Sequence, residues 1–324
     1  MLLIPNQNQA EMKTKPIDYP NVAAPNILPY RVREMMVALK LESTDQAVLD
    51  YLDFFSSKIP IRSVYFEHVL PAIDLYSPNQ SEDKQLMTHY ELNMEAIESM
   101  RDQLEAHPIS ERVEHFGFEV QKGNPLEELL KNADEVMTDL LVIGQKADTN
   151  SHGILARNIA RKVATHALIV PEKSEPKLSR ILVPIDFSEY SVRALRMALS
   201  IQEAISEEVK VEAVHIYQMP DLSIHKIPKT FEQFKSMVES DRKEAFEHFL
   251  STHLEGYEEQ VKLHLVEQKG PGIARFIMNY ANENGADLIV MGAKGHSRVE
   301  RLLLGSVTEK LCSVNDHIPV MVIK

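Results

Sequence analysis

The sequence predicts an α/β protein with two doubly wound domains, each built on a five-stranded parallel sheet. Three observations support this fold class. The chain has 324 residues, which suits two domains of about 150 residues each. Short apolar runs alternate with longer amphipathic stretches, as expected for βαβ units with helices on both faces of a sheet. The second half also repeats the first, so one fold is expected twice.

The repeat is clearest around two glycines. Residues 139–146 (DLLVIGQK) align with 287–294 (DLIVMGAK), and the offset holds without a gap as far as Lys162 and Lys310. Earlier segments agree within a residue or two, since VYFEHVLP at 64–71 matches VHIYQMP at 214–220. The two halves are therefore interpreted as copies of one domain.

The elements follow from hydrophobic periodicity. Strands are expected in the first copy at 35–39, 63–68, 112–120, 140–143 and 167–170, and in the second at 181–185, 209–216, 261–268, 288–291 and 320–323. Helices are expected between them, among others at 191–202, 230–250 and 307–314. The single cysteine, Cys312, lies in the last of these and is expected to be a small buried hydrophobe; one cysteine also excludes an internal disulfide.

A glycine pattern follows the strand expected at 288–291. Gly292, Gly295 and Gly305 are spaced G-x2-G-x9-G and are followed by Ser306. Glycine lets a phosphate approach backbone N–H groups without a Cβ in the way. The helix that begins near Ser306 would offer free N–H groups and the positive end of its dipole. We therefore expect a phosphate-binding loop, although Ser306-x-x-Glu309 also reads as a helix capping box.

This spacing resembles the nucleotide-binding signature of the universal stress protein family, and the resemblance covers nearly all of the chain after residue 30. It differs from the dinucleotide and P-loop motifs, neither of which occurs. The resemblance implies two Rossmann-like domains of the adenine nucleotide alpha hydrolase-like type, each with strand order 3-2-1-4-5, packed as an intramolecular pseudo-dimer. It also implies an ATP-binding, regulatory stress-response protein, with Mg²⁺ or Mn²⁺ arriving on the phosphates.

With that strand order, Asp186 at the end of one strand lies beside Gly292 at the topological switch point, where ligands bind. The alternative for Asp186 is a capping box with Glu189. By resemblance, the base and ribose contacts are Pro184, Ile185, Asp186 and Ile216, the loop contacts are Met291, Gly292 and Gly295, and the phosphate contacts are Gly305, Ser306, Val307 and Thr308. Lys294 and His296 are further candidates for the phosphates.

The first copy departs from the signature. Lys40 stands opposite Asp186, Ala147 opposite Gly295, Arg157 opposite Gly305 and Asn158 opposite Ser306. We expect that this half does not hold ATP in the same way. It is either a structural copy or a site for a different, anionic group that meets Lys40 and Arg157.

The expected organisation is an irregular arm over 1–30, a domain over 31–172 with the degenerate motif, a linker over 173–178, and a domain over 179–324 with the intact motif. The last strand, within 318–324, resembles the family's dimer-forming edge strand. Its counterpart at 167–171 offers a partner inside the same chain. Two ordinary edge strands, or a homodimer, are the alternatives.

Composition excludes several classes. A net charge of −13 argues against nucleic acid and anionic membrane surfaces as partners. No apolar run of membrane-spanning length occurs, so a cytoplasmic protein is expected. The 13 histidines show no metal-ligand spacing, and no protein metal site is predicted.

No arginine finger or Walker-type acid is recognised, so no catalytic residue is predicted. Two other functions remain open. One is slow ATP hydrolysis. The other is an adaptor that binds a regulatory protein or a small hydrophobic ligand through 221–250 instead of nucleotide.

Overall fold

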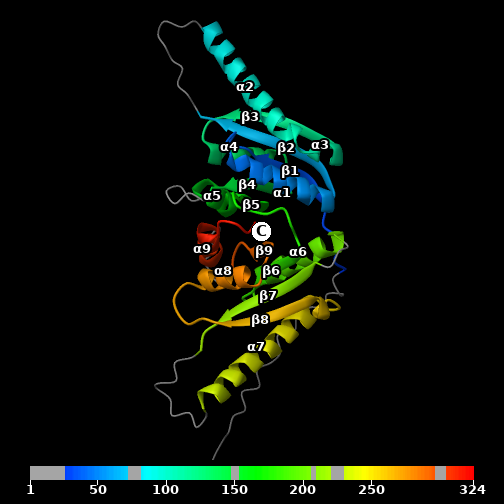
Figure 1. Ribbon diagram of the computed structural model, residues 1–324, viewed down its shortest axis with the longest axis vertical. Coiled ribbons are helices and arrows are strands. Elements are labelled where there is room, and N and C mark those ends of the chain that lie inside the picture. Colours follow the sequence, from blue (N-terminus) through cyan, green and yellow to red (C-terminus); the bar gives the residue numbers. More distant parts are fainter. Residues whose placement is uncertain (1–25, 72–81, 147–152, 206–208, 220–229, 296–303) are drawn as a thin grey trace, which may run out of the picture.

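The computed structural model describes residues 26–71, 82–146, 153–205, 209–219, 230–295 and 304–324. Within these ranges, ten strands form one sheet, which runs through the middle of an elongated molecule (Figure 1). In chain order they are β1 (Val32–Ala38), β2 (Ile61–Leu70), β3 (His115–Lys122), β4 (Leu140–Gln145), β5 (His166–Pro171), β6 (Arg180–Pro184), β7 (Lys210–Tyr217), β8 (Val261–Glu267), β9 (Leu288–Gly292) and β10 (Val320–Ile323).

Helices cover both faces of the sheet (Figure 1). They are α1 (Thr44–Lys58), α2 (Glu82–Glu105), α3 (Ile109–Arg112), α4 (Pro125–Glu135), α5 (Ile154–Lys162), α6 (Glu189–Ile205), α7 (Phe231–His253), α8 (Ile273–Glu283) and α9 (Ser306–Val314), with a short 3₁₀ helix at Glu258–Gln260. No helix among the described residues has the length and apolar character needed to cross a lipid bilayer.

The strand order is β3-β2-β1-β4-β5-β10-β9-β6-β7-β8. Two separate five-stranded sheets were expected, and this detail is wrong. Antiparallel pairing of β5 with β10, which sets Ile169 against Val320 and Ala167 against Val322, joins the two groups of parallel strands. Both strands are almost wholly buried, so leaving their edges open would expose unpaired backbone groups and apolar side chains. The expected pairing of the last strand with its counterpart is confirmed.

The ten expected strands are all present, with ends shifted by a few residues. The largest shifts are in β1, which begins at Val32 instead of 35, and in β3, which begins at His115 instead of 112 because residues 109–112 form the short helix α3. The guanidinium of Arg112 pairs there with the carboxylate of Asp53 on α1 and so holds α3 against that helix. The expected helices at 191–202, 230–250 and 307–314 are also present, as α6, α7 and α9.

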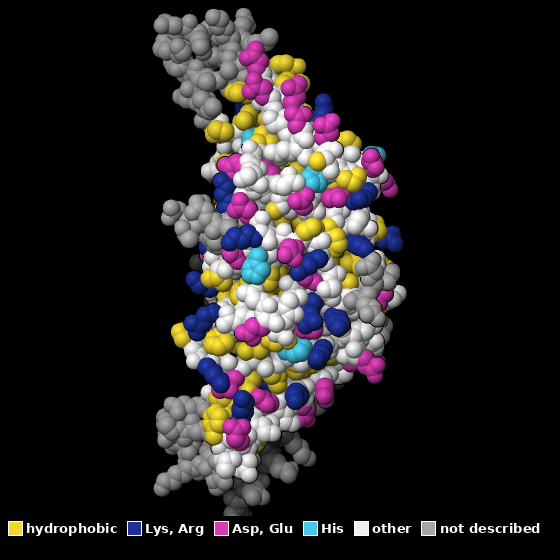
Figure 2. Space-filling model, viewed as in Figure 1, with side chains coloured by type: hydrophobic (Ala, Val, Ile, Leu, Met, Phe, Trp, Pro, Cys, Tyr) yellow, Lys and Arg dark blue, Asp and Glu magenta, His cyan; other side chains and the backbone are white. Residues whose placement is uncertain are grey.

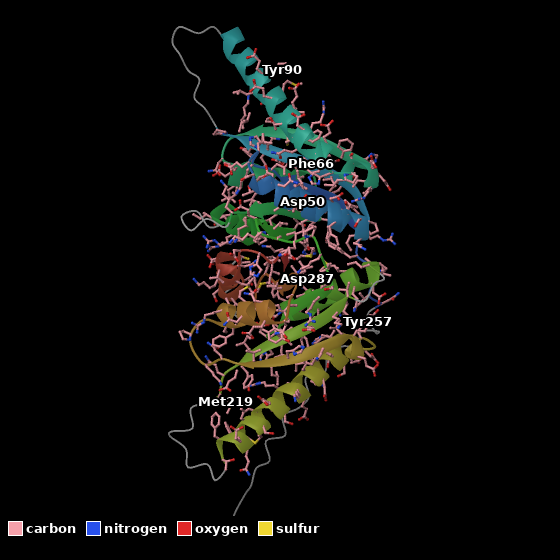
Figure 3. The ribbon with its side chains drawn as sticks, in the orientation of Figure 1. Asp50, Phe66, Tyr90, Met219, Tyr257 and Asp287 are labelled. Carbon is pink, nitrogen blue, oxygen red and sulfur yellow. The ribbon has the colours of Figure 1, made fainter. Side chains whose placement is uncertain are left out.

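The repeat extends to hydrogen bonding. Asp287, at the start of β9, accepts hydrogen bonds at Oδ2 from the backbone N–H groups of Ser179 and Arg180 (Figure 3). Asp139, its counterpart in the first half, accepts from the N–H groups of Arg33 and Glu34. In each half, an aspartate thus ties the fourth strand to the start of the first.

Two groups of buried side chains form the core, one on each face of the sheet. Each group includes residues of both halves: Val142 and Val290 belong to one, Leu141 and Leu311 to the other. The hydrophobic core is therefore continuous across the junction between the halves.

The segment before β1 lies on the second half. The hydroxyl of Tyr257 accepts a hydrogen bond from the N–H of Ile27 at 3.1 Å, and Ser200 on α6 bonds to the backbone of Leu28 and Tyr30 (Figure 3). Residues 26–31 contain no helix or strand. The rest of the predicted arm, 1–25, lies outside the described residues.

The outer end of the first half is acidic. Helix α2 extends away from the sheet and carries exposed Glu91, Glu95 and Glu98 (Figure 2). Negative charge on this surface would repel nucleic acid phosphates.

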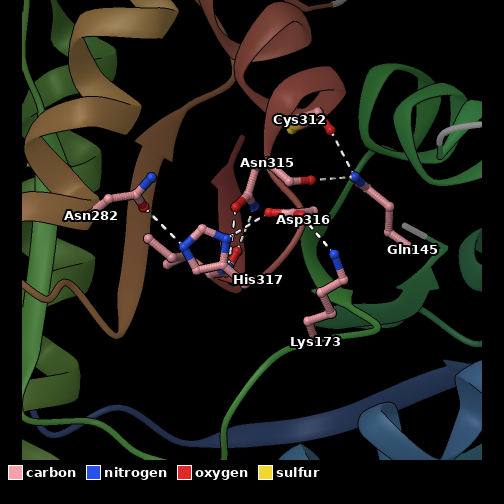
Figure 4. A network of polar contacts seen from close by, with 8 residues as sticks. Gln145, Lys173, Asn282, Cys312, Asn315, Asp316 and His317 are labelled. Atoms are coloured by element: carbon pink, nitrogen blue, oxygen red, sulfur yellow. Dashed lines mark hydrogen bonds and ion pairs between the residues drawn. The ribbon is translucent and has the colours of Figure 1, made fainter. Parts of the chain in front are cut away.

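A polar network crosses the junction (Figure 4). The side-chain amide of Gln145, at the end of β4, donates to the backbone carbonyls of Cys312 at 2.9 Å and Asn315 at 2.8 Å. Lys173 bonds to Asp316 at 3.0 Å nearby, but on the exposed surface. Cys312 itself is buried, and burial raises the pKa of its thiol to about 12, which confirms the expectation of a small buried hydrophobe.

Replacing Gln145 with alanine is expected to lower the free energy of unfolding by about 2–3 kcal/mol, because two buried carbonyls lose their donor. Urea denaturation measures this change. Lys173→Ala is the matched control, since it removes an exposed ion pair across the same junction and is expected to cost at most about 1 kcal/mol. Equal losses in the two variants would contradict a structural role for the buried amide.

Candidate functional site

The twelve residues predicted for the nucleotide site, spread over 125 positions of sequence, line one cavity of about 250 Å³. The cavity lies at the carboxyl ends of β6 and β9, which are parallel neighbours. Pro184 ends β6 and is followed by Ile185 and Asp186, while Ile216 lies in β7. Met291 and Gly292 end β9 and are followed by Lys294 and Gly295. The start of α9 provides Gly305, Ser306, Val307 and Thr308. His296 lies outside the described residues.

The loop that carries Asp186 is held by hydrogen bonds of its own. Asp186 Oδ1 accepts from the N–H of Ser188 at 3.1 Å and from the hydroxyl of Ser191 at 2.8 Å. Phe187, which lies between Asp186 and Ser188, adopts a positive φ of 64° and so turns the chain sharply into α6. These contacts fix the position of the carboxylate before any ligand binds.

The capping-box alternative for Asp186 is wrong. Helix α6 begins at Glu189, and the hydroxyl of Ser188 accepts the N–H of Ser191 and so caps the helix. Glu189 forms an ion pair with Arg193 at 2.6 Å along the helix instead of reaching back. Helix capping is therefore not what requires an acid at Asp186.

Gly295 approaches Asp186 closely. A Cβ built on Gly295 would lie only 2.3 Å from Asp186 Oδ2, well inside van der Waals contact. Any other residue at this position would push the carboxylate out of its place, whereas glycine lets the loop after β9 pass it. The first half changes both members of this pair, with Lys40 and Ala147 at the matching positions.

Gly292 lines the cavity and also has a packing role. A Cβ at this position would lie 2.6 Å from the Cβ of Tyr190 and 3.0 Å from its carbonyl oxygen. Gly144 in the first half is similarly close to Val48, at 2.9 Å. Each glycine lets the fourth strand pack closely against the first helix of its half, so its presence in both copies does not by itself indicate phosphate binding.

Helix α9 begins at the edge of the cavity without a side-chain cap. Gly305 is its N-cap residue and Ser306 its first helical residue, so the capping box expected as an alternative for Ser306 and Glu309 does not form. The first amide groups of a helix have no acceptor within the helix. Those of Ser306, Val307 and Thr308 are therefore oriented as an anion-binding site would require.

The hydroxyl of Thr308 donates to the carbonyl of Gly292 at 3.0 Å. This bond fastens the start of α9 to the end of β9. The side chain of Thr308 is buried and its hydroxyl is already hydrogen-bonded, so Thr308 contributes to the cavity through its backbone.

Five further residues line the cavity and were missed in the sequence: Ser191, Val214, His215, Ile273 and Ile277. His215 Nδ1 donates to the carbonyl of Ile185 at 3.0 Å, and burial lowers the pKa of His215, which keeps the ring neutral near pH 7. The repeat offered a sequence signal for His215, because a histidine, His68, stands at the matching place in the first half. It makes the same bond to the carbonyl of Leu39. Ile273 and Ile277 lie one helical turn apart on α8, so their spacing resembles that of any core-facing helix.

The first half has a cavity of about 320 Å³ at the matching place. Lys40 lines it, but so do Glu42 and Glu67, and Arg157 does not. The expected crevice made basic by Lys40 and Arg157 is therefore not formed. Arg157 and Asn158 lie inside α5, and the N–H of Arg157 donates to Gly153, so the helix starts at Gly153 and Ile154, earlier than the positions that match Gly305 and Ser306.

Comparison with known proteins identifies a family and supports the fold. The model of the universal stress protein family matches residues 177–324, the half that contains the glycine loop. A universal stress protein of Methanocaldococcus jannaschii is 30% identical over 145 residues, which are 45% of this chain and 81% of that protein. The chain belongs to the universal stress protein family.

Two further relatives extend the comparison. The stress response protein NhaX of Bacillus subtilis is 29% identical over 164 residues, covering 45% of this chain and 97% of its own. The crystal structure of a universal stress protein from Archaeoglobus fulgidus covers 90% of this chain and 98% of its own, with a TM-score of 0.58 and 18% identity. The similarity of fold thus extends over both halves, whereas the family model matches the second.

Proposed function

We propose that the chain is a tandem universal stress protein that binds ATP in its second half and regulates a stress response through its nucleotide state. The two domains would be 31–172 and 179–324, joined by 173–178. The observation that carries the proposal is the convergence of the signature residues on one cavity, with the uncapped start of α9 at its edge. The cytoplasm is the expected compartment.

The chemistry of the cavity fits the parts of an adenine nucleotide. Ile216, Met291 and Ile277 provide apolar contacts suited to a flat base. The Asp186 carboxylate is placed to accept a hydrogen bond from a ribose hydroxyl or the adenine amino group. The glycine loop and the first N–H groups of α9 would receive the phosphates, with Lys294 adding positive charge.

A divalent cation would be held mainly by the phosphates. Mg²⁺ prefers few protein ligands together with phosphate oxygens and water. Mg²⁺ or Mn²⁺ would neutralise phosphate charge and orient the triphosphate. Binding, rather than hydrolysis, is the function that these residues support.

Calorimetric titration of the purified protein with ATP and Mg²⁺ tests the proposal, with GTP as the control for the base. Saturable ATP binding at one site per chain is expected, with weaker GTP binding. Mass spectrometry of small molecules released on denaturation provides a second readout. Absence of both released nucleotide and binding heat would overturn the proposal.

Asp186→Asn is expected to weaken ATP binding about 10- to 100-fold, the scale of a hydrogen bond to a charged group. Calorimetry measures the dissociation constant. Ser191→Ala is the control, because it removes the hydroxyl that holds the same loop but leaves the carboxylate in place. A similar loss in both variants would mean that Asp186 acts by ordering the loop.

An adaptor function is the second candidate. Helix α7 exposes Phe231 and Met237, which are 55% and 44% accessible, on the outer side of the second half. A regulatory protein partner would find apolar contacts on this surface. The first part of the predicted surface, 221–229, lies outside the described residues.

A further inference from the structure

The cavity of the first half contains an acid that the second half lacks. Glu67 of β2 lines this cavity, together with apolar side chains such as Leu39, Leu129 and Ile143. Because His68 and His215 make the same hydrogen bond, the matching residue in the second half is Val214. One copy thus presents a carboxylate where the other presents hydrocarbon.

One carboxylate oxygen of Glu67 has no partner among the described residues. The side chain is 1% exposed, and its Oε2 accepts from the amide of Asn132 at 2.9 Å, while Oε1 is buried without a hydrogen bond. A buried polar atom left unpaired costs about 1–3 kcal/mol, and more when it is charged. Glu67 lines the cavity but this oxygen is itself buried, so a ligand in the cavity would pair with it after a small movement of the side chain.

The surroundings of Glu67 favour positive charge. Asn132 also donates to Glu119 at 3.0 Å, so one amide lies between two carboxylates. Burial raises the pKa of Glu67 to about 7; the Asn132 bond opposes this, and the nearby charges of Glu119 and Glu128 add to it. Glu42 also lines the cavity but is paired with Lys146 at 2.6 Å, and Lys40 brings one positive charge.

Anion recognition is opposed by Glu67. Helix α5 begins at Ile154 without a side-chain cap, and Leu155 in its first turn lines the cavity, so free N–H groups lie at this cavity as well. An anion that approached them would also meet the buried carboxyl of Glu67, where the second half has Val214. The two cavities therefore differ in the charge that they present.

We propose that the first-half cavity binds a small ligand with an apolar body and a cationic N–H group, an ammonium or amidinium, which donates to Glu67. The apolar walls receive the body, and the carboxylate pairs with the cation. Such a pair is a charge-assisted hydrogen bond, which is stronger than a neutral one. The first domain is then a second sensor rather than a structural copy.

Benzamidine and benzoate, which share a ring and differ in charge, test the proposal by NMR titration of the full chain. Benzamidine is expected to bind with a millimolar dissociation constant, as is usual for a fragment of this size, and to bind more tightly than benzoate. In Glu67→Gln, which keeps the shape and removes the charge, benzamidine affinity is expected to fall at least about tenfold, equivalent to 1.4 kcal/mol.

Glu127→Gln is the matched control, because this residue is exposed on α4 and outside the cavity, and it should leave benzamidine affinity unchanged. Saturation of the wild-type protein with benzamidine should also lower the pKa of Glu67, followed by carboxyl ¹³C shifts. Tighter binding of benzoate, no saturable benzamidine binding at about 10 mM, or equal affinity in Glu67→Gln would overturn the proposal. ATP titration of Glu67→Gln measures the proposed nucleotide site of the second half separately. Failure of the benzamidine proposal can therefore be told apart from failure of the nucleotide proposal.

Discussion

Replacing Gly305 with leucine is expected to lower ATP affinity at least about 100-fold, close to 3 kcal/mol, without unfolding the protein. Gly305 has φ −71° and ψ 146°, a conformation that any residue adopts. A Cβ there would lie 3.5 Å or more from the nearest protein atoms, which is ordinary contact. The rest of the leucine side chain would enter the space through which the phosphates are proposed to reach α9.

Gly305→Ala is the control for Gly305→Leu. It adds a single methyl group that the protein accommodates, so a loss of affinity below about tenfold is expected. Calorimetry gives the affinities, and urea denaturation shows that both variants keep the stability of the wild type. Unchanged ATP affinity in the leucine variant would mean that no phosphate passes over Gly305.

Replacing Gly292 with alanine is expected to destabilise the protein by about 3 kcal/mol, at the upper end for overpacking of a core. The new Cβ would lie 2.6 Å from the Cβ and 3.0 Å from the carbonyl oxygen of Tyr190. Both atoms are fixed to the backbone at the start of α6, so relief requires the helix to move off the sheet.

The repeat provides the control for Gly292→Ala. In Gly144→Ala the new Cβ meets a methyl of Val48 at 2.9 Å, a side-chain atom that yields more easily than backbone. A smaller loss, about 1 kcal/mol, is expected from urea denaturation of this variant. A larger loss at Gly144 than at Gly292 would contradict the packing explanation.

Most of the fold was predictable because local patterns determine it. The apolar runs of β4, β5, β9 and β10 are buried on both faces and so appear as continuous hydrophobic segments in the sequence. The start of β3 was not predictable in this way, because the turn of helix at α3 depends on the contact of Arg112 with α1. The joining of the two halves into one ten-stranded sheet was predicted only indirectly, as pairing of the last strand with its counterpart at 167–171.

The candidate site was predictable where it follows a motif. The spacing of Gly295 and Gly305 and the acid at Asp186 pointed to residues that the structure brings to one cavity. Ile273 and Ile277 were missed because an apolar residue on a helix has the same pattern whether it faces a ligand or the core. Glu67 was missed because a single acid in a strand has no signature.

The sequence by itself determined the repeated α/β elements, the family and the half that retains the glycine signature, because periodicity and spacing are properties of the chain. Only the tertiary structure decided that Gly292 serves helix packing, that α9 starts without a cap while α5 runs through the matching positions, and that Glu67 is buried with an unpaired oxygen. These features depend on which atoms of distant segments come into contact, and that is set by packing and not by local pattern.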